Sequence, residues 1–207
     1  MVPFYYRVTS ILKPLQVVRV VLFTKGEMKF QNRTVLSIVG TRRHTPHGER
    51  FCKKLIQSIA NYHPIICSGL ARGIDIITHR EALKAGLDSV ACLAHGLDHV
   101  YPSEHKEDAI AIQKQGVLVT DFLPRTPFKR GYFSRRNRLI AGMAVATVVI
   151  ESGISGGSMN TGHLAHLYGR EIFAVPARTD IKSAGCHELI VQQKAQLLSD
   201  PEHLHKK

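Results

Sequence analysis

The segment 129–142, KRGYFSRRNRLIAG, combines positive charge with aromatic side chains in a pattern that suits a polyanionic ligand. Its first ten residues include the cations Lys129, Arg130, Arg135, Arg136 and Arg138. Tyr132 and Phe133 stand among them, and no acidic residue occurs between positions 122 and 150. Cations that follow a phosphate backbone, with rings between them on which bases stack, are typical of proteins that bind single-stranded nucleic acid.

A second basic segment, GTRRHTPHG at 40–48, has the residues of a phosphate-binding loop and also lacks an acid before Glu49. Gly40 allows the backbone to approach an anion closely, and the N–H groups that follow can form an anion-binding nest. Arg42 and Arg43 add guanidinium groups that can bind phosphate oxygens in pairs. The loop is therefore a second candidate for contact with a polyanion.

Two glycine-rich turns follow apolar runs elsewhere in the chain: SGLARGID at 68–75 and SGISGGSMNTG at 152–162. Such turns can present backbone N–H groups to phosphates, and Gly69 and Ser158 are the candidates here. Alternatively, the glycines only permit tight connections between a strand and a helix. The sequence leaves both interpretations open.

Apolar, β-branched runs alternate with helical patterns from residue 34 onward. Strands are predicted at 34–40, 64–69, 89–96, 117–122, 147–152 and 171–177. Helices are predicted at 47–62, 74–86, 103–116, 134–145, 158–169 and 185–194. Strands that are apolar on both faces and alternate with helices form parallel sheets with both faces covered. The predicted fold class is therefore α/β: a Rossmann-like, doubly wound, mostly parallel sheet with helices on both faces.

The order of the strands decides where such a sheet binds its ligand. Ligands bind outside the carboxyl ends of the strands, at the point where the strand order reverses. With the order 3-2-1-4-5-6, this point lies between the first and fourth predicted strands, so the two basic loops, 40–48 and 123–138, converge there. Ser134 is predicted to cap the following helix, which places residues 135–137 in a first turn that attracts phosphate.

The chain of 207 residues is long enough for one good-sized domain, which we place at 20–198. The apolar segment 20–30 is predicted to form an edge hairpin that turns at Lys25-Gly26. Residues 1–19 fit no element, and the tail 199–207 is predicted to be frayed.

Composition restricts the class of partner. The chain has 28 Lys and Arg against 16 Asp and Glu, and a formal net charge of +12 attracts nucleic acid or anionic membrane. No run of 18 apolar residues and no signal-peptide pattern occurs, so no membrane partner is predicted. The four cysteines are isolated, which indicates buried free thiols of a cytoplasmic protein. The histidines lack convincing partners, so no metal site is predicted.

The sequence contains no pattern that predicts a catalytic centre. Neither a P-loop nor the Rossmann glycine fingerprint is present, which argues against a nucleotide cofactor. Glu151 ends a predicted strand near the ligand-binding edge but stands alone. Asp75 and His79 are four residues apart on a predicted helix, where a structural pair is the favoured interpretation.

Several segments together resemble one protein family. They are, in order, SIVGTRRHT, SGLARGIDIITHREAL, HGLDHVYPSEH, FSRRNRLIAG, SGGSMNTGHLA and GREIFAVPA. The chain resembles the DNA-processing protein A family, also called DprA or Smf, over about residues 20–198. The resemblance implies an extended Rossmann-like domain, not an enzyme, that binds and protects incoming single-stranded DNA. It also implies a homodimer that loads RecA recombinase during natural transformation. Candidates for the dimer contact, or for completion of the core, are Leu189, Ile190, Leu197 and Leu198.

The resemblance also implies which residues bind DNA. By position, the family's motifs fall on Gly40, Thr41, Arg42, Arg130, Phe133, Arg136, Asn137 and Arg138. Arg130 takes the place of a DNA-contacting cation, and Phe133 that of a base-contacting ring. Ser134 replaces the family's usual Pro, and Tyr132 stands where Asn or His is common. Neither replacement removes a charge, so binding is expected to persist.

Two alternatives come from other functional classes. Related phosphoribohydrolases of the lysine-decarboxylase-like, cytokinin-activating type carry a G-G-x-G-T-x-x-E loop. In the corresponding GGSMNTGHL, Asn160 replaces a glycine and Leu164 replaces the catalytic Glu. The other alternative is a protein that binds acidic protein partners, against which the aromatic-arginine segment argues mildly.

Overall fold

The computed structural model describes residues 5–6, 21–27, 30, 33–176 and 183–206. Within these residues the strands form one sheet in the order β1-β2-β6-β5-β4-β3-β7-β8-β9. The strand bounds are β1 (Tyr5–Tyr6), β2 (Leu22–Gly26), β3 (Val35–Gly40), β4 (Ile65–Ser68), β5 (Ser89–Cys92), β6 (Gly116–Thr120), β7 (Ala146–Ile150), β8 (Glu171–Ala174) and β9 (Gln196–Leu197). Neighbours from β6 through β9 pair in parallel, whereas β2 pairs antiparallel with both β6 and β1. The predicted mostly parallel α/β sheet is confirmed.

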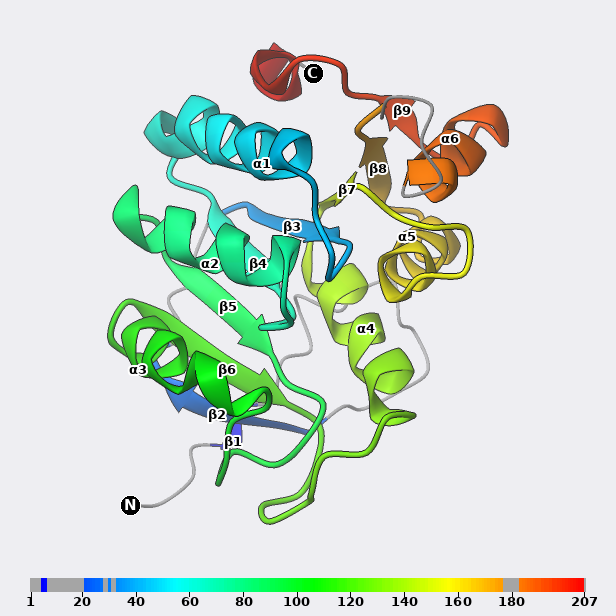
Figure 1. The fold of residues 1–207 in the computed structure, drawn as a ribbon. Coiled ribbons are helices and arrows are strands. Elements are labelled where there is room, and N and C mark those ends of the chain that lie inside the picture. The colour runs from blue at the N-terminus through cyan, green and yellow to red at the C-terminus, as the bar shows by residue number, and fades with distance from the viewer. Residues whose placement is uncertain (1–4, 7–20, 28–29, 31–32, 177–182, 207) are drawn as a thin grey trace.

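Helices cover both faces of the sheet, as predicted. Their bounds are α1 (Pro46–Ile59), α2 (Ile74–Lys84), α3 (Lys106–Lys114), α4 (Tyr132–Met143), α5 (Gly157–Leu167) and α6 (Ala184–Val191), with 3-10 helices η1 (Ala60–Tyr62), η2 (Ser103–His105) and η4 (Pro201–Lys206). Figure 1 shows α1, α2 and α3 over one face and α4 and α5 over the other. The side chains of β3 alternate accordingly: Leu36 and Ile38 pack with α1 and α2, and Val39 packs with α4 and α5.

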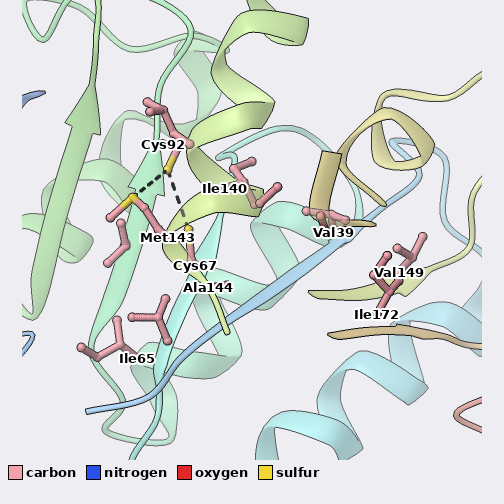
Figure 2. Packing of buried hydrophobic residues seen from close by; sticks show 14 of the residues in the cluster. Val39, Ile65, Cys67, Cys92, Ile140, Met143, Ala144, Val149 and Ile172 are labelled. Carbon is pink, nitrogen blue, oxygen red and sulfur yellow. Dashed lines mark hydrogen bonds between the residues drawn. The ribbon is translucent and has the colours of Figure 1, made fainter. Parts of the chain in front are cut away.

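The core beneath α4 holds two of the free cysteines. Figure 2 shows Cys67 of β4 and Cys92 of β5 beside Met143 of α4, and the two sulfur atoms are 3.8 Å apart. The remaining cysteines, Cys52 and Cys186, are also buried and form no disulfide. The prediction of buried free thiols is confirmed. No group of metal-ligating side chains is found among the described residues.

The predicted strand order was wrong in one respect. The six predicted strands lie in the order 4-3-2-1-5-6, because β6 pairs with β5 instead of β3. The winding direction reverses only with α4, which connects β6 to β7. The switch point therefore lies between β3 and β7, which pair directly. Local sequence patterns carry no signal for the crossover at which the winding reverses.

Two predictions about the chain termini also need correction. No hairpin turns at Lys25-Gly26: β2 runs through both residues and pairs with β6, where Gly26 lies opposite Val117. A Cβ at Gly26 would lie 2.3 Å from the carbonyl oxygen of Gly116, so this close pairing requires glycine. The tail was predicted to be frayed, but it contains the helix η4. Ser58 Oγ of α1 donates to the carbonyl of Pro201 at 3.3 Å and holds the tail against α1. Most of segment 1–19 lies outside the described residues.

One predicted helix start differs as well. Ser103 begins the short helix η2 and makes no capping hydrogen bond, and α3 follows from Lys106. None of the helices in the described part of the chain is long and apolar enough to cross a membrane.

Candidate nucleic-acid interface

A pocket of about 540 Å³ opens at the carboxyl ends of β3 and β7, at the switch point of the sheet. Its lining comes from four places: the end of β3 with the loop after it, the start of α2, the first turns of α4, and the glycine-rich loop into α5. The predicted residues that line it are Gly40, Thr41, Arg42, Arg43, Arg130, Phe133, Arg136, Asn137 and Ser158. This is the position at which open α/β sheets bind ligands.

The two basic loops converge, although not for the predicted reason. The loop after β3 lies at the switch point directly. The loop after β6 leads into α4, and residues at the start of this helix line the same pocket as the residues after β3. Contact between the loops is direct, since the Arg42 guanidinium lies 4.4 Å from the centre of the Phe133 ring.

The pocket rim carries exposed positive charge. Arg42, Arg43 and Arg130 are all exposed, and none forms an ion pair with a described residue. Phe133 is half-buried, so the ring is neither a core residue nor fully free. Together these side chains offer guanidinium groups for phosphates and an aromatic face beside them.

Arg136 lines the bottom of the pocket, and its buried side chain has a structural role. Its side chain is only 3% exposed, and Nη1 donates to the carbonyl of Cys92 at 2.8 Å. Burial lowers the pKa of Arg136, and the buried carboxylate of Asp75 opposes this effect. Gly69 makes room for the guanidinium, because a Cβ there would lie 1.8 Å from Nη1. Gly69 thus admits Arg136 and does not itself line the pocket.

Asp75 is a pocket residue that sequence reasoning placed elsewhere. Burial raises the pKa of its carboxyl, while Arg136 and hydrogen bonds from the backbone N–H groups of Gly40 and Ala71 act in the opposite direction. Asp75 and His79 do not bond each other as a pair. The imidazole of His79 instead accepts from Leu70 N at 3.3 Å and contacts Ser89 Oγ at 2.7 Å. Its pKa is lowered to about 3, mainly by burial, so it stays neutral.

The α5 side of the pocket is built from small residues. Asn137 Nδ2 donates to the carbonyl of Gly157 at 3.0 Å, which ties the start of α5 to α4. Ser158 Oγ donates to Ser152 Oγ at 2.8 Å. Gly156 caps α5 without a side-chain hydrogen bond, and the first amides of a helix have no intrahelical acceptor. This end of α5 therefore faces the pocket with unused N–H donors.

The structure differs from two sequence predictions near α4. The helix begins at Tyr132 with Gly131 as its N-cap, so Ser134 lies inside the first turn and caps nothing. Arg138 does not line the pocket. Its Nη2 donates to the carboxylate of Asp121, which Arg135 Nε also contacts at 2.9 Å. Arg138 is five residues after Phe133, which is about 140° around the helix, so the two side chains face different sides.

Glu151, predicted to stand alone, closes the amino terminus of α1. Its carboxylate accepts from the backbone N–H of Thr45 at 2.8 Å and from that of Gly48 at 3.2 Å, and it also contacts the Thr45 hydroxyl. These are the groups that a phosphate would bind at this helix end. An anion in the pocket therefore meets the guanidinium groups and α5, but not α1.

Sequence reasoning missed an aromatic cluster beside the pocket. Phe133 contacts Phe128 edge to face, with ring centres 5.1 Å apart, and Phe128 stacks on Tyr101 at 3.6 Å. Tyr101 lies between β5 and η2, whereas Phe128 and Phe133 lie just before and within the first turn of α4. The spacing of these rings has no periodic pattern, so only the fold brings them together.

Comparison with known proteins decides the family. The family described as DNA recombination-mediator protein A matches residues 6–207. The chain belongs to this family. It is 34% identical to Protein Smf of Escherichia coli over 88% of this chain, and 33% identical to DNA processing protein DprA of Bacillus subtilis over 89%. It spans 49% and 62% of the length of these two relatives.

Solved structures of DNA processing protein A have the same fold. The protein from Streptococcus pneumoniae superposes with a TM-score of 0.92 at 30% identity, over 99% of this chain and 74% of that one. The protein from Helicobacter pylori gives 0.88 at 24% identity, over 97% and 92%. The Helicobacter protein is described as having a unique single-stranded DNA binding mode.

Proposed function

We propose that this chain binds single-stranded DNA in the pocket between β3 and β7. The observation that carries the proposal is the meeting of Arg42, Arg43 and Arg130 around the half-buried Phe133 at the switch point of the sheet. Phosphates bind the guanidinium groups and the free N–H donors of α5, and a base stacks against the aromatic ring. Bases reach such a ring only when they are unpaired, so a single strand fits and a duplex does not.

Recombination mediation is the wider role that we propose. Membership of a family described as recombination mediators supports it, as does the single-stranded DNA binding described for the Helicobacter relative. In this role the protein protects incoming DNA and loads RecA recombinase during natural transformation. A cytoplasmic location is part of the same proposal.

We propose further that the protein is not an enzyme. The phosphoribohydrolase alternative requires a carboxylate where this chain has Leu164, whose side chain packs against the core. A leucine cannot donate or accept a proton. Incubation with AMP and related monophosphates is expected to release no free base; release would favour the alternative.

The proposal includes a homodimer, with a contact that differs from the one the sequence suggested: Ile190 packs partly against the core, and Val191 is added. Leu189 and Leu198 are buried within this chain, so they complete its core. Val191 and Leu197 remain 76% and 53% exposed near the β9 edge of the sheet, and these are the candidates for the contact. Light scattering at micromolar concentration is expected to give about twice the 23.1 kDa chain mass.

Fluorescence anisotropy with labelled oligo(dT) tests the DNA proposal. Binding to the oligonucleotide is expected to survive competition by duplex DNA. The logarithm of the association constant should fall linearly with the logarithm of the salt concentration, with a slope of about −0.7 for each neutralised phosphate. The variants Arg42→Ala and Arg130→Ala should each weaken binding for every sequence tested. Tighter binding to duplex, or binding that ignores salt, contradicts the proposal.

A further inference from the structure

Two adjacent rings at the start of α4 face different sides of the helix. Successive helical residues are about 100° apart, so Phe133 lines the pocket while Tyr132 does not. The Tyr132 ring instead packs against Phe122, the second residue after β6, with centres 4.5 Å apart. The proposed pocket makes no use of this second aromatic pair.

Cations accompany these two rings as they do Phe133. Lys129 Nζ lies 5.8 Å from the centre of the Tyr132 ring, and the Arg135 guanidinium lies 4.7 Å from that of Phe122. Lys129 is exposed, and the side chain of Arg135 is 53% exposed. We call these four residues, Phe122, Lys129, Tyr132 and Arg135, the outer patch. None of them lines the pocket.

The outer patch has a surplus of positive charge. Asp121 is the acid in contact with it, and this nearly buried carboxylate is shared between Arg135 and Arg138. Lys129 forms no ion pair with a residue that the structure describes. Lys129 lies two residues before Gly131, the N-cap of α4, and Arg135 lies at the end of the first turn. Cations at this end of a helix oppose the helix dipole. An anion bound here removes that conflict.

We propose that the outer patch is a second contact for single-stranded DNA, occupied by nucleotides that leave the pocket across the first turn of α4. This inference rests on the proposed function and extends it by assigning a path to the strand. The connection is continuous, since Arg130 lines the pocket and Lys129, its neighbour, belongs to the patch. Phosphates bind Lys129 and Arg135, and bases stack on the Tyr132 ring and the outer face of the guanidinium.

The chemistry of the patch selects nucleic acid over an acidic peptide. A peptide carboxylate uses the cations but has no planar group to place against Tyr132. A nucleotide uses both, because aromatic rings and guanidinium planes each stack bases. The alternation of cation and ring also repeats the arrangement of Arg42 and Phe133 in the pocket.

Oligonucleotide length separates the two sites. Anisotropy titrations use oligo(dT) of about 4 nucleotides, which fills the pocket, and about 12, which reaches beyond it. Tyr132→Leu is expected to weaken binding of the long oligonucleotide about 5- to 150-fold and to leave the affinity for the short one unchanged. Lys129→Ala should lower the salt slope of the long one by about 0.7, and Lys129→Arg should restore it. Lys54→Ala, an exposed lysine on α1, is the charge-matched control.

The outcomes are distinct. Loss confined to the long oligonucleotide supports the patch. The proposal is overturned if both variants keep the affinity and the salt slope for the long oligonucleotide. It is also overturned if they lose the same affinity for both lengths. Competition for the patch by poly-glutamate without any length dependence also overturns it, in favour of an acidic peptide. Because Lys129 is exposed, Lys129→Ala decides the matter even if Tyr132→Leu fails to fold. Failure of Arg42→Ala to weaken the short oligonucleotide counts against the pocket instead.

Discussion

Replacing Arg136 by methionine tests whether this arginine holds the site together or binds DNA. The change removes the charge and keeps most of the side-chain length. It leaves the carbonyl of Cys92 without the donor that lies 2.8 Å away. It also leaves Asp75, a buried carboxyl, without the guanidinium that opposes the effect of burial on its pKa. Both losses occur beneath the pocket and away from solvent.

The expected cost follows from these two losses. Leaving a buried acceptor without its hydrogen bond typically costs about 1–3 kcal/mol, and the lost attraction between the guanidinium and the Asp75 carboxylate adds to this cost. At about 2–4 °C per kcal/mol for a chain of this length, the melting temperature should fall by about 2–12 °C. Urea unfolding followed by far-ultraviolet circular dichroism measures the loss, since the chain has no tryptophan. The control Arg135→Met, which removes an exposed cation and leaves Arg138 on Asp121, should cost less than about 1 kcal/mol.

The pH dependence identifies the cause. Burial raises the pKa of Asp75 above its ordinary value of 3.8, so the folded state holds this proton more tightly than the unfolded state. Stability from this group is therefore greatest at low pH and declines as pH rises from the unfolded pKa toward the folded pKa. Without Arg136 that pKa rises further, so the variant should lose more stability at pH 8 than at pH 5. A loss below about 1 kcal/mol at both pH values, with DNA binding reduced, would refute the structural role.

The remaining predictions concern stacking, space and thiol reactivity. Phe133→Ala should cost roughly 1–3 kcal/mol of DNA binding with a nearly unchanged salt slope, whereas Arg42→Ala should lower the slope, as anisotropy at several salt concentrations can show. Gly69→Ala should displace the guanidinium of Arg136 and lower the urea midpoint, and its effect should not add to that of Arg136→Met. Because burial raises the pKa of Cys52 to about 12, and all four thiols are buried, a thiol reagent at pH 8 should label them only after unfolding.

Much of the fold was predictable because the apolar residues are periodic. β3 to β8 all appear as apolar runs in the sequence, and the helices between them lie within a few residues of their predicted ranges. The order of the strands was not predictable in the same way. Whether β6 pairs with β5 or β3 depends on where a crossover helix lies, and that is a property of the whole sheet.

The candidate site was predictable where it consists of loops and uncertain where it depends on packing. Arg42, Arg130 and Phe133 were named from local chemistry, and the fold brings them to one pocket. The burial of Arg136 was not visible in the sequence, because its neighbours are equally basic. Only three-dimensional contacts separate it from Arg135, which is half-exposed one residue earlier.

In the proposed binding mode, the contacts of Glu151 with the start of α1 decide where an anion binds. Three helices begin near the carboxyl ends of β3 and β7, and each helix start attracts negative charge. The carboxylate of Glu151 already satisfies the first N–H groups of α1, so a phosphate placed there would meet a like charge. The start of α4 carries its own cations, and that of α5 presents free N–H donors. We therefore expect phosphate to bind in the gap between α4 and α5, where the ring of Phe133 is available to the adjoining base.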